Sequence, residues 1–135
     1  MGPVTGETDP RTLLSGMRPE LNPGRYVFTM AEGGVPSGCS PVVTVTEQEG
    51  LTLVLPQADA DAAGMAYDYV AGWITLRVHS TLDAIGLTAA VARALADAGL
   101  SCNVVAGFHH DHLFVPYEQA GRAMEILQGL AGATH

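Results

Sequence analysis

Two short apolar segments that end in proline recur in this chain, 60 residues apart, and each leads into a segment with helical character. They are Leu53-Val54-Leu55-Pro56 and Leu113-Phe114-Val115-Pro116. Proline has no amide N–H to donate to a sheet, and its fixed φ suits the first turn of a helix. In each half we also expect a helix and a further strand upstream, the strand covering 25–31 in the first half and 101–107 in the second. This order of elements predicts a tandem duplication of one α+β unit.

The composition describes a folded chain whose charge excludes some functions. Of the 135 residues, 47% are hydrophobic, so a core can form, and 14 acidic residues stand against 6 basic ones. Nucleic-acid binding relies on Lys and Arg contacts to phosphates, so we expect none. No apolar run approaches the roughly 18–20 residues that span a membrane, and no basic-then-apolar signal pattern opens the chain. We therefore expect a cytoplasmic protein without a membrane partner, with Cys39 and Cys102 as reduced thiols.

Breaker residues divide the N-terminal half into short elements. Residues 1–8 have no hydrophobic period and predict a disordered tail. Asp9-Pro10 can start a helix over 11–17, which Pro19 and Pro23-Gly24 end. The further predicted elements are a strand over 25–31, a hairpin with strands 42–46 and 51–55 around the turn 47–50, and a helix over 57–65.

Hydrophobic periodicity is clearest in the C-terminal half. The apolar run Val70–Val78 is the strongest strand signal in the chain. Apolar residues then recur at steps of four, four and three, which places on one helical face Leu87, Val91, Leu95 and Ala98. Gly99 fits the position just past the end of that helix. The remaining predicted elements are a strand over 101–107, a turn over 109–112, a strand over 113–115 and a helix over 117–130.

The stretch between the strong strand and this helix carries a family resemblance. It reads His79-Ser80-Thr81-Leu82-Asp83-Ala84-Ile85-Gly86-Leu87, with an acid three residues before a glycine and a leucine just after it. An amphipathic helix ending in Leu95–Leu100 follows, and Asn103 starts the next strand. This pattern, over about residues 70–106, resembles an ACT domain.

The resemblance implies a ferredoxin-like βαββαβ fold of the α+β class. The whole chain is similar to small stand-alone proteins built from two tandem ACT-like units, here 9–66 and 67–135. The first unit is incomplete, since it lacks its own opening strand and an acid-x-x-glycine turn. A strand shared between the halves, around 70–78, would complete the count. Where the family often has proline before the glycine, this chain has Ile85.

The same resemblance implies a ligand site in the second unit. Its residues would be Asp83, Ala84, Ile85, Gly86, Leu87 and Asn103. A glycine at a strand-to-helix junction lets the backbone approach a ligand, and the amides of a first helical turn attract a carboxylate. Asp83 could meet the ammonium group of an amino acid, while Asn103 offers a donor and an acceptor. In the alternative interpretation, Asp83 caps the helix and Gly86 makes the turn.

The function implied by the resemblance is that of a non-catalytic sensor. It would bind an amino acid or similar small metabolite at an interface between units or subunits, as a homo-oligomer and most simply a dimer. No cofactor is implied, and any enzyme that it regulates would be a separate chain. No nucleophile elbow, Walker loop or dinucleotide motif indicates catalysis. A ligand-free protein-interaction module is a further alternative.

A histidine cluster supports a competing hypothesis. His109, His110 and His112 surround Asp111, and His79 ends the strong strand. Imidazoles and carboxylates bind divalent metals, and a histidine can act as a base near neutral pH. Because alternate residues of a strand share a face, His110 and His112 could join His79 in a three-ligand metal site or metal-dependent enzyme. His109 and Asp111 would then point the other way. In the alternative interpretation, these side chains only shape a polar turn.

Overall fold

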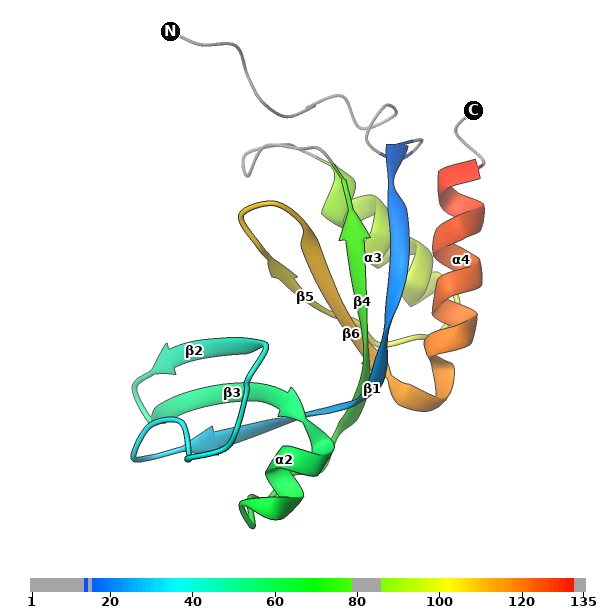
Figure 1. Cartoon of the computed structure of the whole chain (residues 1–135). Helices are drawn as coiled ribbons and strands as arrows, with labels where there is room; N and C mark the ends of the chain where they lie inside the picture. The colour runs from blue at the N-terminus through cyan, green and yellow to red at the C-terminus, as the bar shows by residue number, and fades with distance from the viewer. Residues whose placement is uncertain (1–13, 15, 79–85, 133–135) are drawn as a thin grey trace, which may run out of the picture.

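The computed structural model describes residues 14, 16–78 and 86–132, which build one six-stranded antiparallel sheet with helices packed against it (Figure 1). The sheet order is β2-β3-β1-β4-β6-β5. The strands are β1 (Arg18–Ala31), β2 (Val43–Glu47), β3 (Gly50–Pro56), β4 (Val70–Arg77), β5 (Asn103–Ala106) and β6 (Asp111–Pro116). The helices are α2 (Gln57–Ala62), α3 (Leu87–Asp97), the 3₁₀ turn η1 (Tyr117–Gln119) and α4 (Ala120–Gly132). The α+β, ferredoxin-like class is thereby confirmed.

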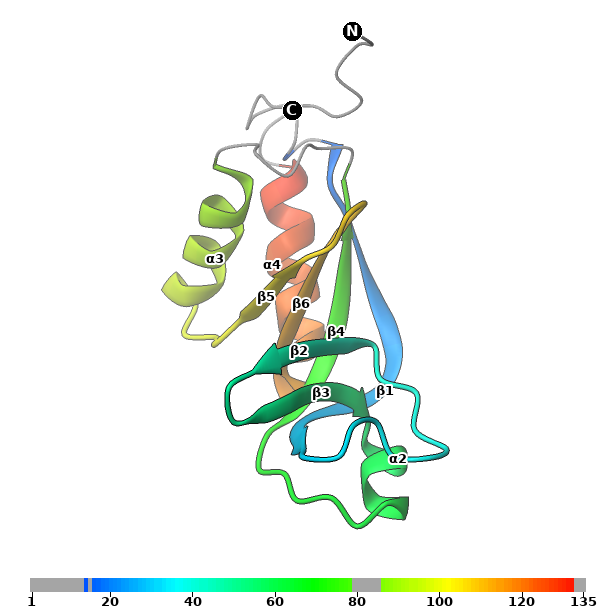
Figure 2. The ribbon, with the colours of Figure 1, turned by 90° about the vertical axis from the view of Figure 1, so that its left-hand side faces the viewer.

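All of these helices cover the same face of the sheet, as the alternation along β4 shows. Val70 packs against the apolar cluster beneath α2, whereas Ile74 and Leu76 belong to the cluster beneath α3 and α4. Even-numbered residues of one strand share a face, so the three helices lie on one side. Figure 2 looks onto the other face, where β5 and β6 lie in front of α4.

β1 begins earlier than predicted, because it runs through Pro19 and Pro23. Its residues 18–22 pair with β4 alone, whereas 26–31 pair with β3. A strand with a free edge tolerates proline, because the missing N–H removes no bond to a second neighbour. The register shifts between these two parts, where Gly24 takes a φ of 97°. The prediction that these prolines precede the strand was therefore wrong.

The strand registers reveal an approximate two-fold symmetry around one central pair. Tyr26 lies opposite Ala71 in the middle of the sheet. Tyr26 also pairs with Pro56 on β3, the other neighbour of β1. In the same way, Ala71 also pairs with Pro116 on β6, the other neighbour of β4. The two prolines of the repeated segment thus occupy equivalent places, which confirms the 60-residue repeat.

The outer strands keep the same correspondence. Val43 of β2 lies opposite Val54, and Asn103 of β5 lies opposite Phe114. Hence β1, β2, β3 and α2 correspond to β4, β5, β6 and α4. The order of predicted elements matched the strand at 25–31 with the strand at 101–107, and this match was wrong because β1 corresponds to β4.

Each unit borrows a strand from the other. The first unit uses β4 beside β1, and the second uses β1 beside β4, so that both contain a four-stranded sheet. We expected one shared strand around 70–78, and the sheet has two. The first unit also lacks a helix between β1 and β2, where residues 32–42 form turns and extended backbone in place of α3. Its incompleteness thus lies in the first helix and not in an opening strand.

The other predicted elements agree with the structure to within a few residues. The hairpin, the strong strand, α3 and the final helix are confirmed. The helix predicted over 57–65 ends at Ala62, before Gly64 with its φ of 68°. β6 starts at Asp111, so His112 lies in a strand and not in a turn. The tail at 1–8 and most of the helix predicted over 11–17 lie outside the described residues.

Three apolar clusters hold the sheet and helices together. One fills the space between the sheet and α3 and α4, and a second lies beneath α2. The third covers the opposite face near the centre and includes Tyr26, Phe114 and Trp73. There the ring of Trp73 meets Tyr26 edge-on at 5.3 Å between centroids and stacks on Phe114 at 6.3 Å. Beyond Trp73, toward the end of β4, this opposite face becomes polar.

Both cysteines are free and partly buried, as predicted. Burial raises the pKa of Cys102 to about 11, so its thiol stays protonated at neutral pH.

Candidate functional site

Gly86 occupies the turn that leads into α3. It is the N-cap residue of that helix and has a left-handed backbone, with φ 100° and ψ −21°. Its carbonyl accepts the first helical hydrogen bond, from the N–H of Ala90 at 2.9 Å. Left-handed backbone at a helix start favours glycine because a Cβ would crowd the neighbouring carbonyl. Leu87, next to it, is 3% exposed and packs in the main core.

Three of the six predicted ligand residues fall outside the described part of the chain. They are Asp83, Ala84 and Ile85, and His79 of the metal hypothesis lies outside it as well. Asp83 therefore stays a predicted ligand residue, and Gly86 marks the described end of this corner.

Asn103 does not lie at this corner. It sits opposite Phe114, which sits opposite Trp73, whereas the chain leaves β4 after Arg77. At about 3.3 Å per residue along a strand, Asn103 lies about 13 Å below that end. α3 runs back along the sheet from Gly86. The strand that follows it, β5, therefore starts at the opposite end of the sheet from Gly86. The structure therefore does not bring Asn103 and Gly86 together within one chain.

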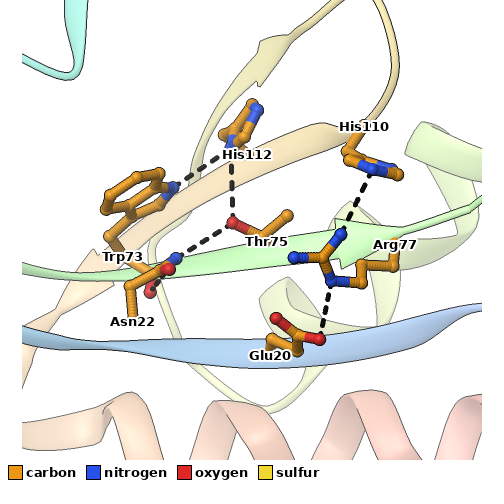
Figure 3. Close-up of polar contacts among 7 residues, drawn as sticks. All are labelled: Glu20, Asn22, Trp73, Thr75, Arg77, His110 and His112. Carbon is orange, nitrogen blue, oxygen red and sulfur yellow. Dashed lines mark hydrogen bonds and ion pairs between the residues drawn. The ribbon is translucent and has the colours of Figure 1, made fainter.

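A charged group stands at the end of β4 from which the chain leads to Gly86 (Figure 3). The Nε of Arg77 donates to the carboxylate of Glu20 on β1 at 2.6 Å. Its Nη1 lies 3.4 Å from Nε2 of His110. Both partners of the ion pair are about half exposed, so the pair adds little stability but fixes where a cation stands. Sequence reasoning missed Arg77, although it is the last residue of β4, the strand predicted most strongly.

His112 is held on the same face by its neighbours on β4. The indole N–H of Trp73 donates to Nδ1 of His112 at 3.1 Å, and the hydroxyl of Thr75 lies 3.5 Å from that nitrogen. The amide of Asn22 donates in turn to the Thr75 hydroxyl at 2.9 Å and to the Trp73 carbonyl at 3.2 Å. An acceptor Nδ1 requires the neutral ring with its proton on Nε2. Burial, with a smaller effect of His110, lowers the pKa of His112 in the same sense.

Asp111 points to the other face, as the alternation predicted. It precedes Leu113 and Val115 at steps of two, and these pack beneath α3 and α4. Asp111 lies opposite Leu76, at the end of β4 that leads to Gly86. Burial raises the pKa of its carboxyl, and the charges of His112 and His110 partly offset this rise. A half-buried carboxylate thus stands on the helix-covered face at the same end of the sheet as Gly86.

The described histidines do not form a metal centre. Within 14, 16–78 and 86–132, no three His, Cys, Asp or Glu side chains group as metal ligands would. Nδ1 of His112 is occupied by Trp73, and Nε2 of His110 faces a guanidinium that would repel a dication.

Comparison with protein families identifies both halves of the chain. Two family models described as ACT domain match it, one over residues 5–72 and the other over 69–129. The chain therefore belongs to the ACT domain family, as two tandem units of a class of regulatory, small-ligand-binding domains. The two matches overlap at the start of β4, the strand that both units use. A search of curated proteins found no significant match.

Solved structures share the whole arrangement. A crystal structure of a protein of unknown function from Vibrio cholerae, described as a "Possible Transport Protein", is 45% identical, with a TM-score of 0.82 over 90% of this chain and 94% of that one. A protein from Agrobacterium tumefaciens is 18% identical, with a TM-score of 0.66 over 85% and 89%. The ligand-free regulatory subunit of aspartate kinase from Thermus thermophilus is 10% identical, with a TM-score of 0.61 over 87% and 97%. At such identities the last two show the fold alone.

None of the helices in the described ranges is long and apolar enough to cross a membrane.

Proposed function

We propose that the protein is a non-catalytic regulatory protein that binds an amino acid or a similar small metabolite. The ligand binds at the corner from Asp83 to Leu87, where its carboxylate meets backbone amides at the start of α3. The observation that carries this proposal is the left-handed Gly86 at the N-cap of α3, inside the second ACT match. The regulatory subunit of aspartate kinase among the structural neighbours supports the class of function by analogy.

The charges at this end of the sheet support a zwitterionic ligand. Asp111 is a half-buried carboxylate on the helix-covered face, and besides the predicted Asp83 it can attract an ammonium group. Arg77 supplies a positive charge at the same end, on the opposite face. The backbone amides at the start of α3 suit a carboxylate and Asp111 suits an ammonium group, so we expect a ligand with both charges.

A thermal unfolding screen with each common amino acid tests the proposal. Binding to the folded state alone raises stability by about 2.7 kcal/mol when the ligand is at a hundred times its Kd. We expect at least one amino acid to raise the Tm, and Gly86→Ala to remove that response. A screen without any response at millimolar concentrations would overturn the proposal.

Gly99→Ala is the matched control for this variant. Gly99 also has a positive φ, 82°, at the other end of α3, and a Cβ there meets nothing within 4 Å. Both substitutions strain the backbone by about 1–2 kcal/mol. Only Gly86→Ala should abolish the ligand response, and equal loss in both variants would show that the response reports general stability.

Within the same proposal the protein is a cytoplasmic homodimer. Its free cysteines fit a reducing compartment. β2 is an edge strand of the sheet and exposes Val45, so that a second copy can pair along it. Light scattering should give twice the chain mass. A monomer would contradict the dimer but would leave the proposal of ligand binding unaffected.

A further inference from the structure

An open cavity of about 300 Å³ lies at the surface of the molecule, and Gly86 is not among its lining residues. It is lined by the irregular part of β1, from Pro23 to Tyr26, and by the start of α2, from Pro56 to Ala58. This volume is at the small end of the range of about 300–1,000 Å³ for ligand pockets. The cavity thus adjoins the pair of Tyr26 and Ala71 through which the approximate two-fold axis passes.

Arg25 brings a fixed positive charge to this cavity. Its guanidinium carbon lies 4.3 Å from the centre of the Tyr117 ring, over the ring face. Arg77–Glu20 is the single ion pair among the residues that the structure describes, so no described carboxylate neutralises Arg25. Stacking on an aromatic ring holds the guanidinium plane while its N–H edge stays able to bind a carboxylate. In a chain of net charge −8, this unneutralised cation is a local anion site.

Gln57 forms part of the same wall. Its amide nitrogen donates to the hydroxyl of Tyr67 at 3.0 Å, and that hydroxyl donates to Asp61 at 2.7 Å. These two hydrogen bonds hold the Gln57 side chain in place as part of the wall. Pro23, Pro56 and the ring of Tyr26 make the rest of the wall apolar.

The residues that correspond to Arg25 and Gln57 in the second unit are of other types. By the register around Tyr26 and Ala71, Arg25 corresponds to Val70, and Gln57 corresponds to Tyr117. Val70 is packed against the cluster beneath α2, and Tyr117 is the ring under Arg25. The cation of this cavity is therefore supplied by the first unit, which lacks the helix that carries the Gly86 corner in the second.

We propose that this cavity is a second ligand site, which binds a small organic carboxylate with a compact apolar body. The carboxylate pairs with the guanidinium of Arg25, and the body packs between Pro23, Pro56 and the Tyr26 ring. Benzoate is a suitable probe, because benzamide has the same shape without the charge.

The test is a titration of the uniformly ¹⁵N-labelled protein followed by NMR. Benzoate should shift the amide signals of Gly24, Gln57 and Ala58 saturably at millimolar concentration, and benzamide should bind at least about tenfold more weakly. Arg25→Gln should weaken benzoate binding by a similar factor. Ala58→Leu, which fills the cavity, should weaken it as well while leaving Arg25 in place.

Arg122→Gln is the matched control, since it removes an exposed arginine of α4 and changes the net charge equally. It should leave benzoate binding unchanged, and so should Gly86→Ala. An unchanged benzoate affinity in Arg25→Gln, with a spectrum that shows the variant folded, would overturn the proposal. Absence of saturable shifts at Gly24, Gln57 and Ala58 in the unmodified protein would overturn it too, without bearing on amino-acid binding at Gly86.

Discussion

The indole N–H of Trp73 points at Nδ1 of His112 across the boundary between β4 and β6, and this bond exists only while His112 is neutral. The pKa of His112 lies below its usual 6.5, mainly because the ring is partly buried. As the pH falls below 6.5, His112 therefore becomes protonated in the unfolded chain while it is still neutral in the folded chain. The free energy of unfolding should decrease over this interval, until His112 also protonates in the folded state.

Urea unfolding between about pH 5 and pH 8 measures this effect, and His112→Asn supplies the control. An asparagine oxygen can replace Nδ1 as acceptor for Trp73 but does not titrate. The variant should therefore lose part of the decrease in stability below pH 6.5. If both proteins follow the same pH profile, His112 is not the group responsible.

Replacing Asp111 should raise the stability of the protein and reduce its response to the ligand. Burial raises the pKa of its carboxyl, so ionisation at neutral pH is less favourable in the folded chain than in the unfolded one. Asp111→Asn should raise the free energy of unfolding at pH 7, by less than about 1 kcal/mol because solvent screens a half-buried group. If Asp111 attracts the ammonium group of the ligand, the same variant should also reduce the Tm shift that the amino acid causes. A lower stability at pH 7 would contradict this reading of the burial.

Gly72 should be the glycine of the sheet that least tolerates a side chain. A Cβ on Gly72 would stand 2.8 Å from the Cβ of Ala120, where α4 crosses β4. Gly72→Ala should therefore cost about 1–3 kcal/mol, since a packed core must move to admit the methyl group. Gly129→Ala, inside α4 with open space around the new methyl, should instead gain about 0.5–1 kcal/mol. Denaturant unfolding checks both predictions. The midpoint of Gly72→Ala should be lower than that of the unmodified protein, and the midpoint of Gly129→Ala should be higher.

Local patterns in the sequence were enough for the elements of the second unit. The helical spacing placed Leu87, Val91 and Leu95 on one face, and all three are buried in the main core. The same reasoning failed for β1, because Pro19 reads as a breaker until one knows that β1 has a free edge there. Which strand lies beside which is set by pairing between residues about 50 positions apart, as with Asn22 and the carbonyl of Trp73, and no local signal reports it.

The candidate site was predicted in part for the same reason. Gly86 was singled out because the acid-x-x-glycine pattern before the helix resembles an ACT domain, and in the structure Gly86 has a left-handed backbone at the start of α3. The distance of Asn103 from Gly86 could not be predicted, because it depends on the direction in which α3 crosses the sheet. Arg77 and Asp111 gave no signal of their own, since one is an ordinary exposed arginine and the other lay among histidines that attracted a metal hypothesis.

The exchange of strands between the two units predicts that neither unit folds alone. We divide the chain as 9–66 and 67–135, and fragments 1–66 and 67–135 would each lose a central strand, β4 from the first and β1 from the second. Each fragment would then expose Tyr26 or Ala71 at a new sheet edge, without the cross-strand partner that buries it. Neither should show cooperative thermal unfolding by circular dichroism, whereas an equimolar mixture should recover the transition of the intact chain. A cooperative transition in either fragment by itself would mean that its core does not depend on the borrowed strand.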